Sequence, residues 1–328
     1  MINLTDAINK INQFYCEKNG TIHIPKGFFS AGFWVVLAAY AKLKGVQNGN
    51  ISFENAQLQG YASAIGLSKA LWNLDCFRYI RKNEGFNYSS LECLDCPEST
   101  DKATSCINSC VRKMFSSIEV PESFVSQFCD VIGDMHDNVW SHGMNLGFSV
   151  AQKWLVNNYK DDYWFEFALA DAGIGLLGEI KRCGLKDIAS NHCEAIEWCI
   201  KEGNSTKKHR PENGWAQTMP SDIINNPLRG IEKISFSNGS HHQGLGLSKL
   251  VRFVETAGGQ LWLSSGDHVL ELSPAGRRRY SRLISPWQGV ALACRFRKSV
   301  VKENFKPTQT NAHIERIKQQ LLKGGRHE

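Results

Sequence analysis

Hydrophobic and polar positions in the first hundred residues change period several times, which predicts short helices and strands in alternation. Ile8, Ile11 and Phe14 recur at helical spacing and predict a helix over residues 5–18. The next patterns predict a strand over 21–24, a buried helix over 28–44 and a strand over 50–53. The apolar run of the second helix is too short to span a bilayer. We therefore expect a small α/β domain over residues 1–115.

A second hydrophobic pattern begins after Pro121 and predicts longer elements. Its apolar residues share one face of a helix that we expect to run to about Asn145: Phe124, Phe128, Val131, Ile132 and Met135. Residues 148–156 suit either a helix or a strand. The aromatic, almost uncharged stretch 163–170 predicts a buried strand.

Polar residues form a stripe on the helix that follows Pro121. Asp134, Asn138 and His142 succeed one another at four-residue spacing and therefore lie on one helical face. A carboxylate, an amide and an imidazole need hydrogen-bond partners when they leave water. A solvated surface would supply them, and so would a bound ligand. The stripe alone leaves both interpretations open.

Two glycine turns add candidate chemistry. The buried strand ends in Asp171-Ala-Gly-Ile-Gly175, a turn that lets a ligand approach the backbone closely, although ordinary Asp-Gly turns are common. Gly244-Leu-Gly-Leu247 opens a helix that runs to about Thr256, and the amides at a helix start suit an anion. Each turn alone is a weak signal.

The order of these segments is more specific. Asp134 with Asn138, then the Asp171–Gly175 turn, then Gly244–Leu247 resemble the three nucleotide boxes of one ATPase superfamily. This is the gyrase, chaperone, histidine-kinase and mismatch-repair superfamily (GHKL ATPases, the Bergerat fold). The stretches that follow the third box are similar to those of histidine kinases: residues 250–264 and 287–296.

The resemblance covers roughly residues 120–300 and implies a fold. We expect an α/β (α+β) protein, a two-layer sandwich of the Bergerat type. Its mixed, mostly antiparallel sheet would carry helices on one face and follow a smaller α/β domain. The expected divisions are a domain over 1–115, an ATP-binding domain over 116–300 with its lid at about 176–243, and a basic C-terminal helix or tail over 301–328.

The resemblance also implies roles for the residues in the boxes. Asn138 would bind Mg²⁺ through its side-chain oxygen, and Asp171 would accept a hydrogen bond from the adenine amino group of ATP. Asp134 would be the base in hydrolysis. The backbone of six further residues would approach the base, sugar and phosphates closely: Gly173, Gly175, Gly244, Leu245, Gly246 and Leu247.

Three residues depart from the family's pattern. Asp134 stands in place of the usual glutamate and is one methylene shorter, so we expect slow hydrolysis. His242 replaces a glycine that often begins the phosphate box. Val290 replaces a frequent threonine, which removes one hydroxyl near the base. None of these changes removes nucleotide binding.

Basic residues lie in the expected lid and in a later hairpin. Lys207, Lys208 and Arg210 would clamp a triphosphate or would simply belong to a solvated loop. The Arg277–Arg282 cluster would meet nucleic acid or an acidic protein, but a solvated hairpin tip is the favoured interpretation.

Cysteines and overall composition set wider limits. Cys93, Cys96, Cys106 and Cys110 form two close pairs of the kind that hold structural zinc, but their short loop and helical spacing favour free thiols. The chain has 328 residues, 42% of them apolar, and a net charge of +6. It has eleven cysteines and an amino terminus without a secretory pattern. We therefore expect reduced thiols, a cytoplasmic protein and no membrane segment.

The expected function is a conformational switch. Closure of the lid over Mg-ATP would change self-association as a homodimer, or the binding of a separately encoded protein partner. One alternative is a serine/threonine kinase of the anti-sigma-factor type, because Phe29–Phe33 faintly resembles STAS domains. Another is a non-hydrolysing regulatory module. A bacterial regulatory or defence system is suggested by analogy alone.

Overall fold

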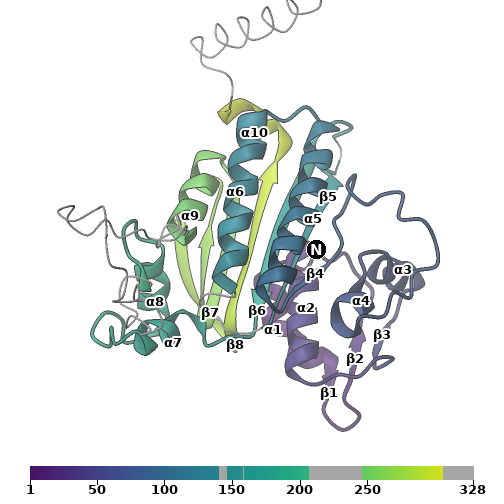
Figure 1. Cartoon of the computed structure of the whole chain (residues 1–328), viewed down its shortest axis with the longest axis horizontal. Helices are drawn as coiled ribbons and strands as arrows, with labels where there is room; N and C mark the ends of the chain where they lie inside the picture. The colour runs from purple at the N-terminus through teal and green to yellow at the C-terminus, as the bar shows by residue number, and fades with distance from the viewer. Residues whose placement is uncertain (140–145, 158, 207–245, 306–328) are drawn as a thin grey trace, which may run out of the picture.

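The computed structural model describes residues 1–139, 146–157, 159–206 and 246–305. Within these ranges the chain is mixed α/β, which confirms the predicted class (Figure 1). The helices are α1 (Leu4–Phe14), α2 (Ala31–Leu43), α3 (Ala56–Ala64), α4 (Leu67–Trp72), α5 (Pro97–Ser116), α6 (Glu122–Asn138), α7 (Gly175–Arg182), α8 (His192–Cys199), α9 (Gly246–Thr256) and α10 (Lys298–Asn304). The strands are β1 (Tyr15–Cys16), β2 (Thr21–Ile24), β3 (Ile51–Phe53), β4 (Glu92–Leu94), β5 (Gly147–Leu155), β6 (Tyr163–Asp171), β7 (Gln260–Leu272) and β8 (Arg278–Arg297).

The larger sheet has the strand order β4-β5-β6-β8-β7, with antiparallel pairing between all neighbours described. Its central strand β6 is the predicted aromatic strand, and the ambiguous stretch 148–156 forms most of β5. In the register of β5 and β6, Gly147 lies opposite Asp171. The candidate residue Asp171 therefore ends the middle strand, with neighbours on both sides.

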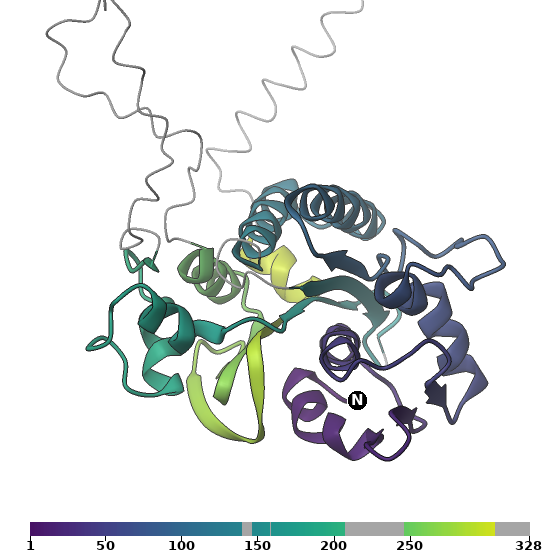
Figure 2. The ribbon, with the colours of Figure 1, turned by 60° about the horizontal axis from the view of Figure 1, so that its bottom comes forward.

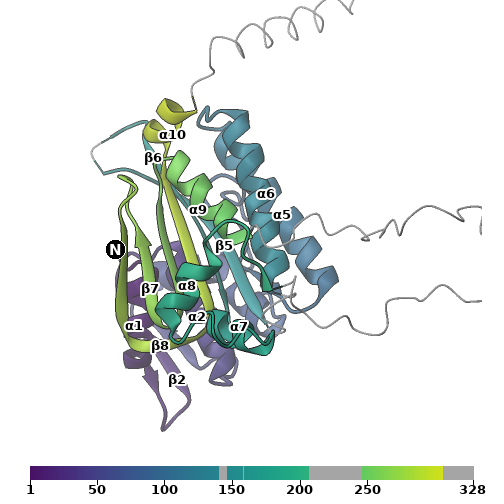
Figure 3. The same ribbon diagram turned by 90° about the vertical axis from the view of Figure 1, so that its left-hand side faces the viewer.

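One face of this sheet is covered by α5, α6 and α9 (Figure 3). Phenylalanine rings fill the space between the helices and the sheet. The Phe128 ring of α6 lies 5.5 Å from the Phe253 ring of α9 and 5.2 Å from the Phe296 ring of β8, measured between centroids. These contacts fix α6 and α9 side by side, so the polar end of α6 lies next to the start of α9.

The opposite face is covered by α1 and α2 (Figure 2). Every residue of α2 from Ala31 to Ala41 is buried, because the helix has apolar side chains all round and needs neighbours on every side. It packs on Phe148 and Val150 of β5 and on Ala168 of β6. Within the described ranges, no helix is both long and apolar enough to cross a bilayer.

A buried ion pair fastens α2 to the sheet. The Glu166 carboxylate of β6 accepts hydrogen bonds from Nε of Arg295 at 2.7 Å and from the backbone N–H of Gly32 at 2.9 Å. The Arg295 guanidinium lies between the rings of Trp154 and Trp262, at 5.3 and 4.8 Å from their centroids. An acid inside an otherwise apolar strand is thus neutralised by a partner from β8.

These contacts correct two expectations about architecture. Helices lie on both faces of the sheet, so the molecule has a third layer that the two-layer prediction lacked. The predicted 1–115 domain contains the small β1-β2-β3 sheet, but its α1, α2, β4 and α5 belong to the cores of the larger sheet. The reason is physical, because α2 has no polar face to turn toward solvent. Of the expected C-terminal helix or tail over 301–328, the structure describes only residues 301–305, which complete and follow α10; the rest lies outside the described residues.

Candidate functional site

The turn after β6 is held in place by β8. Asp171 is 4% exposed, and its Oδ1 accepts hydrogen bonds from the backbone N–H groups of Gly173 at 2.8 Å and Val290 at 3.2 Å. Its carbonyl oxygen accepts a hydrogen bond from Nε1 of Trp287 at 3.2 Å. The strand end and the predicted Asp171–Gly175 turn are therefore one rigid unit with β8.

Gly289 makes this close approach possible. Its φ is +93°, a conformation that favours glycine. A Cβ atom at this position would lie 2.5 Å from Oδ1 of Asp171 and 2.7 Å from the backbone nitrogen of Gly173. Sequence reasoning did not include Gly289 among the site residues. The signal was a glycine inside an otherwise apolar strand, which often marks a close backbone approach.

Burial sets the protonation of the Asp171 carboxyl. It raises the pKa of Asp171 to about 6, although the two backbone N–H donors act in the opposite direction. The described residues donate hydrogen bonds only to Oδ1. At pH 7 and above the carboxyl is mostly ionised, and a donor from a ligand would stabilise it.

Gly175 brings the start of α7 against the same unit. Its φ is +71°, and a Cβ atom there would lie 2.9 Å from Oγ of Ser265 and 3.1 Å from the carbonyl oxygen of Gly289. Ser265 Oγ accepts a hydrogen bond from the Leu176 N–H at 3.0 Å and donates one to the Gly289 carbonyl at 3.1 Å. The glycine at position 175 is required by packing as well as by backbone conformation.

The first and third predicted boxes meet at the ends of two helices. Asn138 is the last residue of α6, and Gly246 is the first residue of α9. A Cβ atom on Gly246 would lie 2.8 Å from Nδ2 of Asn138 and 3.0 Å from Cε of Met135. A side chain at position 246 would therefore require the ends of the Asn138 and Met135 side chains to move.

These groups surround one hollow. It has an empty volume of about 810 Å³, including space open to solvent. Predicted residues on its wall are Asn138, Asp171, Gly175, Gly246 and Leu247. The residues that complete the described wall are Met135, Val139, Leu169, Leu176, Glu179, Trp198, Cys199, Asn204, Ser205, Thr206, Val290 and Leu292.

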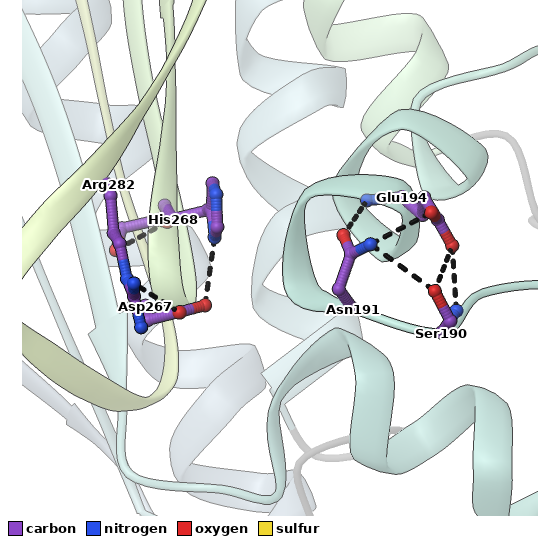
Figure 4. A network of polar contacts seen from close by, with 7 residues as sticks. Ser190, Asn191, Glu194, Asp267, His268 and Arg282 are labelled. Carbon is purple, nitrogen blue, oxygen red and sulfur yellow. Dashed lines mark hydrogen bonds and ion pairs between the residues drawn. The ribbon is translucent and has the colours of Figure 1, made fainter.

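The wall formed by α7 and α8 falls within the expected lid, residues 176–243, but its residues after Gly175 were not named as site residues. Glu179 of α7 is buried, and its carboxylate accepts hydrogen bonds from Nε of Arg182 at 2.7 Å and from Oγ1 of Thr206 at 3.3 Å. The α8 helix contributes Trp198 and Cys199 to the wall. Its N-cap is Asn191, whose side chain accepts the Glu194 N–H (Figure 4). The hollow thus has one polar, carboxylate-bearing side besides Asp171.

Asp134 and His136 of α6 point elsewhere. Asp134 is buried and does not contribute to the described wall of the hollow; its Oδ2 lies 2.8 Å from Nζ of Lys249 in α9. His136 is bonded through its ring nitrogens to Oγ1 of Thr104 at 2.7 Å and Oγ of Ser149 at 2.8 Å. Burial lowers the pKa of His136 to about 3, so its ring is neutral and braces α5, α6 and β5.

The other sequence candidates lie apart from the hollow. Cys93 and Cys96 are at β4 and the start of α5, and Cys106 and Cys110 lie along α5, all four as free thiols. Among the described residues, no group of three or more His, Cys, Asp and Glu side chains has an arrangement that would hold a metal ion. Several predicted positions lie outside the described residues: His142, Lys207, Lys208, Arg210, His242, Gly244 and Leu245.

Most of the arginine cluster on the β7–β8 hairpin has acidic neighbours. Arg278 lies 2.7 Å from Glu255, and Arg282 lies 3.2 Å from Asp267. Asp267 also pairs with His268 at 2.8 Å (Figure 4). The positive charge of the cluster is therefore partly compensated within the chain, as on a solvated hairpin.

Comparison with models of known families, with curated protein sequences and with solved structures gives no match for this chain.

Proposed function

We propose that the hollow between α6, α7 and α9 binds Mg-ATP and that ATP binding acts as a conformational switch. The observation that carries the proposal is the Asp171 carboxylate. It is buried at the end of β6, held by two backbone N–H groups on one oxygen, and lines the hollow. A buried carboxylate of this kind is suited to a ligand that brings its own donor, such as the adenine amino group.

The other walls suit the remaining parts of the nucleotide. The backbone at Gly175 gives the base and sugar close access to the turn. The predicted residue Gly173 does not line the hollow; its N–H group is bonded to Asp171 and holds the turn. The first turn of α9, with Gly246 and Leu247 on the hollow, offers the end of a helix to the phosphates. Anion binding at this helix start agrees with the box pattern in the sequence.

Asn138 is the residue that would hold the magnesium ion. Its side-chain amide lies on the hollow next to Gly246, where α9 begins. Mg²⁺ keeps phosphate oxygens and waters as ligands, so one amide oxygen from the protein is sufficient. The absence of a His, Cys, Asp or Glu cluster among the described residues is compatible with such a site. The ion would neutralise charge on the triphosphate.

The switch is supported by the position of the expected lid, residues 176–243, in the chain. The described part of this segment lines the hollow through Leu176, Glu179 and Thr206, and Gly246 lines it just beyond the segment. A ligand in the hollow therefore contacts the described residues at both ends of that segment. The segment would change conformation on binding, and the change would alter self-association or the binding of a protein partner.

Titration calorimetry with ATP and GTP in the presence of Mg²⁺ tests the binding site. We expect ATP to bind about tenfold or more tightly than GTP, because guanine carries a carbonyl oxygen, an acceptor, at the ring position where adenine carries the amino donor for Asp171. Asp171→Asn keeps an oxygen for Gly173 and Val290 but turns an amide donor toward the base, so it should weaken ATP binding by about tenfold or more. Asp187→Asn, on the exposed surface, is the control and should bind ATP normally. Equal affinity for the two nucleotides, or no effect of Asp171→Asn, would contradict the proposal.

Native mass spectrometry and hydrogen exchange test the switch. A non-hydrolysable ATP analogue should change the assembly state or the exchange protection of residues 207–245. Nucleotide binding without either change would exclude the switch and leave a nucleotide-binding module. Transfer of labelled phosphate to a protein, instead of its release as free phosphate, would favour a kinase.

A further inference from the structure

An ion pair joins the predicted catalytic residue to the helix of the third box. Oδ2 of Asp134 lies 2.8 Å from Nζ of Lys249, across the α6–α9 packing. The Asp134 side chain is 4% exposed, whereas that of Lys249 is 40% exposed. The carboxylate is therefore fixed inside the molecule, and the ammonium reaches it from the surface.

The pair lies between two cavities. Met135 and Asn138 line the nucleotide hollow, while Val131 and Lys249 line a separate groove between α6 and α9. Asp134 shares a helical stripe with Asn138, one turn away, but its carboxylate is turned toward Lys249. The acid that would serve hydrolysis is thus engaged on the groove side of α6.

This contact matters for the chemistry of ATP hydrolysis. The oxygen of a water forms a bond to the γ-phosphorus, the bond from that phosphorus to the bridging oxygen breaks, and ADP and phosphate are released. A carboxylate base takes the proton that the water loses. A carboxylate that already accepts a hydrogen bond from an ammonium group is less free to turn toward the attacking water.

We propose that Lys249 is a positioning residue that restrains Asp134, so that the protein retains ATP instead of hydrolysing it rapidly. This inference rests on the proposed function. Lys249 borders the groove and can leave the pair toward solvent, while Asp134 remains buried. Once released, the carboxylate reaches the side of the hollow by rotation about its own side-chain bonds, since it lies on the stripe of Asn138.

Three variants test the restraint through hydrolysis and binding together. Lys249→Met keeps the length of the side chain and removes its charge; it should raise the rate of ATP hydrolysis by at least about tenfold and leave the Kd for Mg-ATP unchanged. Lys249→Arg keeps the charge and should hydrolyse ATP at the original rate. Adding Asp134→Asn to Lys249→Met should remove the gain. Lys201→Met removes another lysine on the same groove and is the control.

Thermal unfolding of the ligand-free protein gives a readout that does not depend on activity. Lys249→Met should lower Tm because it removes the ammonium group that contacts a buried carboxylate, and adding Asp134→Asn should restore part of the loss. Additive effects of the two changes would show that the pair is not coupled. Unchanged or slower hydrolysis in Lys249→Met, with ATP binding intact, would overturn the inference. Failure of the unmodified chain to bind ATP would instead overturn the proposed function, and this inference with it.

Discussion

Strand β6 carries two buried acids on opposite faces of the sheet, and their surroundings differ. Glu166 faces α2 and is neutralised by Arg295, with a further hydrogen bond from the Gly32 N–H. Asp171 faces the hollow and has backbone donors on one oxygen, and burial raises its pKa to about 6. Both acids cost free energy to bury, but only Glu166 has a cation beside it.

The difference separates a structural acid, Glu166, from Asp171, the acid for which we propose a role in ligand binding. The Glu166 pair is complete within the chain, so it orders α2 on the sheet and has no further bond to offer a ligand. Asp171 is held at a cost to stability that a donor from outside would reduce. Proteins keep such unfavourable groups where they serve binding, which is why we place the ligand at Asp171 and not at Glu166.

The largest effect should follow from breaking the Glu166 pair. Glu166→Gln leaves the buried Arg295 without a counter-charge and should lower the free energy of unfolding by about 3–5 kcal/mol, measured by urea denaturation. Glu255→Gln is the control, because its pair with Arg278 is partly exposed and should contribute less than about 1 kcal/mol. Equal losses in the two variants would show that burial does not distinguish the pairs.

A methyl group beside Asp171 should have the next largest effect. Gly289→Ala combines a positive φ with overlap on Oδ1 of Asp171, and we expect a loss of about 3 kcal/mol together with loss of nucleotide binding. Gly276→Ala also has a positive φ but nothing within 4 Å of its Cβ atom, so it should lose about 1 kcal/mol and still bind. The same loss in both variants would mean that backbone conformation alone is responsible.

Neutralising Asp171 should stabilise the ligand-free protein. The folded-state pKa of about 6 exceeds the ordinary value of 3.8, so the folded state binds a proton more tightly than the unfolded state. Stability therefore falls as pH rises from about 4 to about 6, by up to about 3 kcal/mol. Asp171→Asn should recover that amount at pH 8 and almost nothing at pH 4, as measured by urea denaturation at both values. Destabilisation at pH 8 would contradict the comparison with Glu166.

The smallest effect concerns Val290, which stands where the ATPase superfamily that the sequence resembles often has a threonine hydroxyl. Val290 lines the hollow, and its backbone N–H already bonds Asp171. Val290→Thr should strengthen Mg-ATP binding by roughly threefold, the size of one added hydrogen bond, and change stability by less than about 1 kcal/mol. Calorimetric titration measures the affinity of the variant and of the unmodified chain for Mg-ATP. Weaker binding by the variant would indicate that the base lies away from this strand.

Local patterns predicted the elements of the fold well and their assembly less well. The aromatic stretch 163–170 and the helix after the third box required only periodicity and glycine signals. The ambiguous stretch 148–156 became a strand because β4 and β6 pair with it on both sides, which no local window contains. The packing of α1 and α2 on the second face of the sheet likewise depends on long-range contacts.

The candidate site also could be predicted from sequence patterns only in part, because some of its contacts join distant segments. Asn138, Asp171, Gly175 and Gly246 were predicted from an ordered pattern, and the fold brings them to one hollow. Lys249 was not predicted as the partner of Asp134, because their contact joins helices far apart in the sequence. Gly289 carried only a weak local signal. Side-chain partners across an interface depend on three-dimensional packing, which the pattern of one chain does not specify.

A crystal structure of the chain with Mg²⁺ and a non-hydrolysable ATP analogue tests the central claim most directly. The account predicts the adenine amino group within hydrogen-bond distance of the Asp171 carboxylate, the phosphates at the first turn of α9, and Mg²⁺ bound by the side-chain oxygen of Asn138. An analogue bound elsewhere on the molecule, or a base that does not contact Asp171, would contradict it.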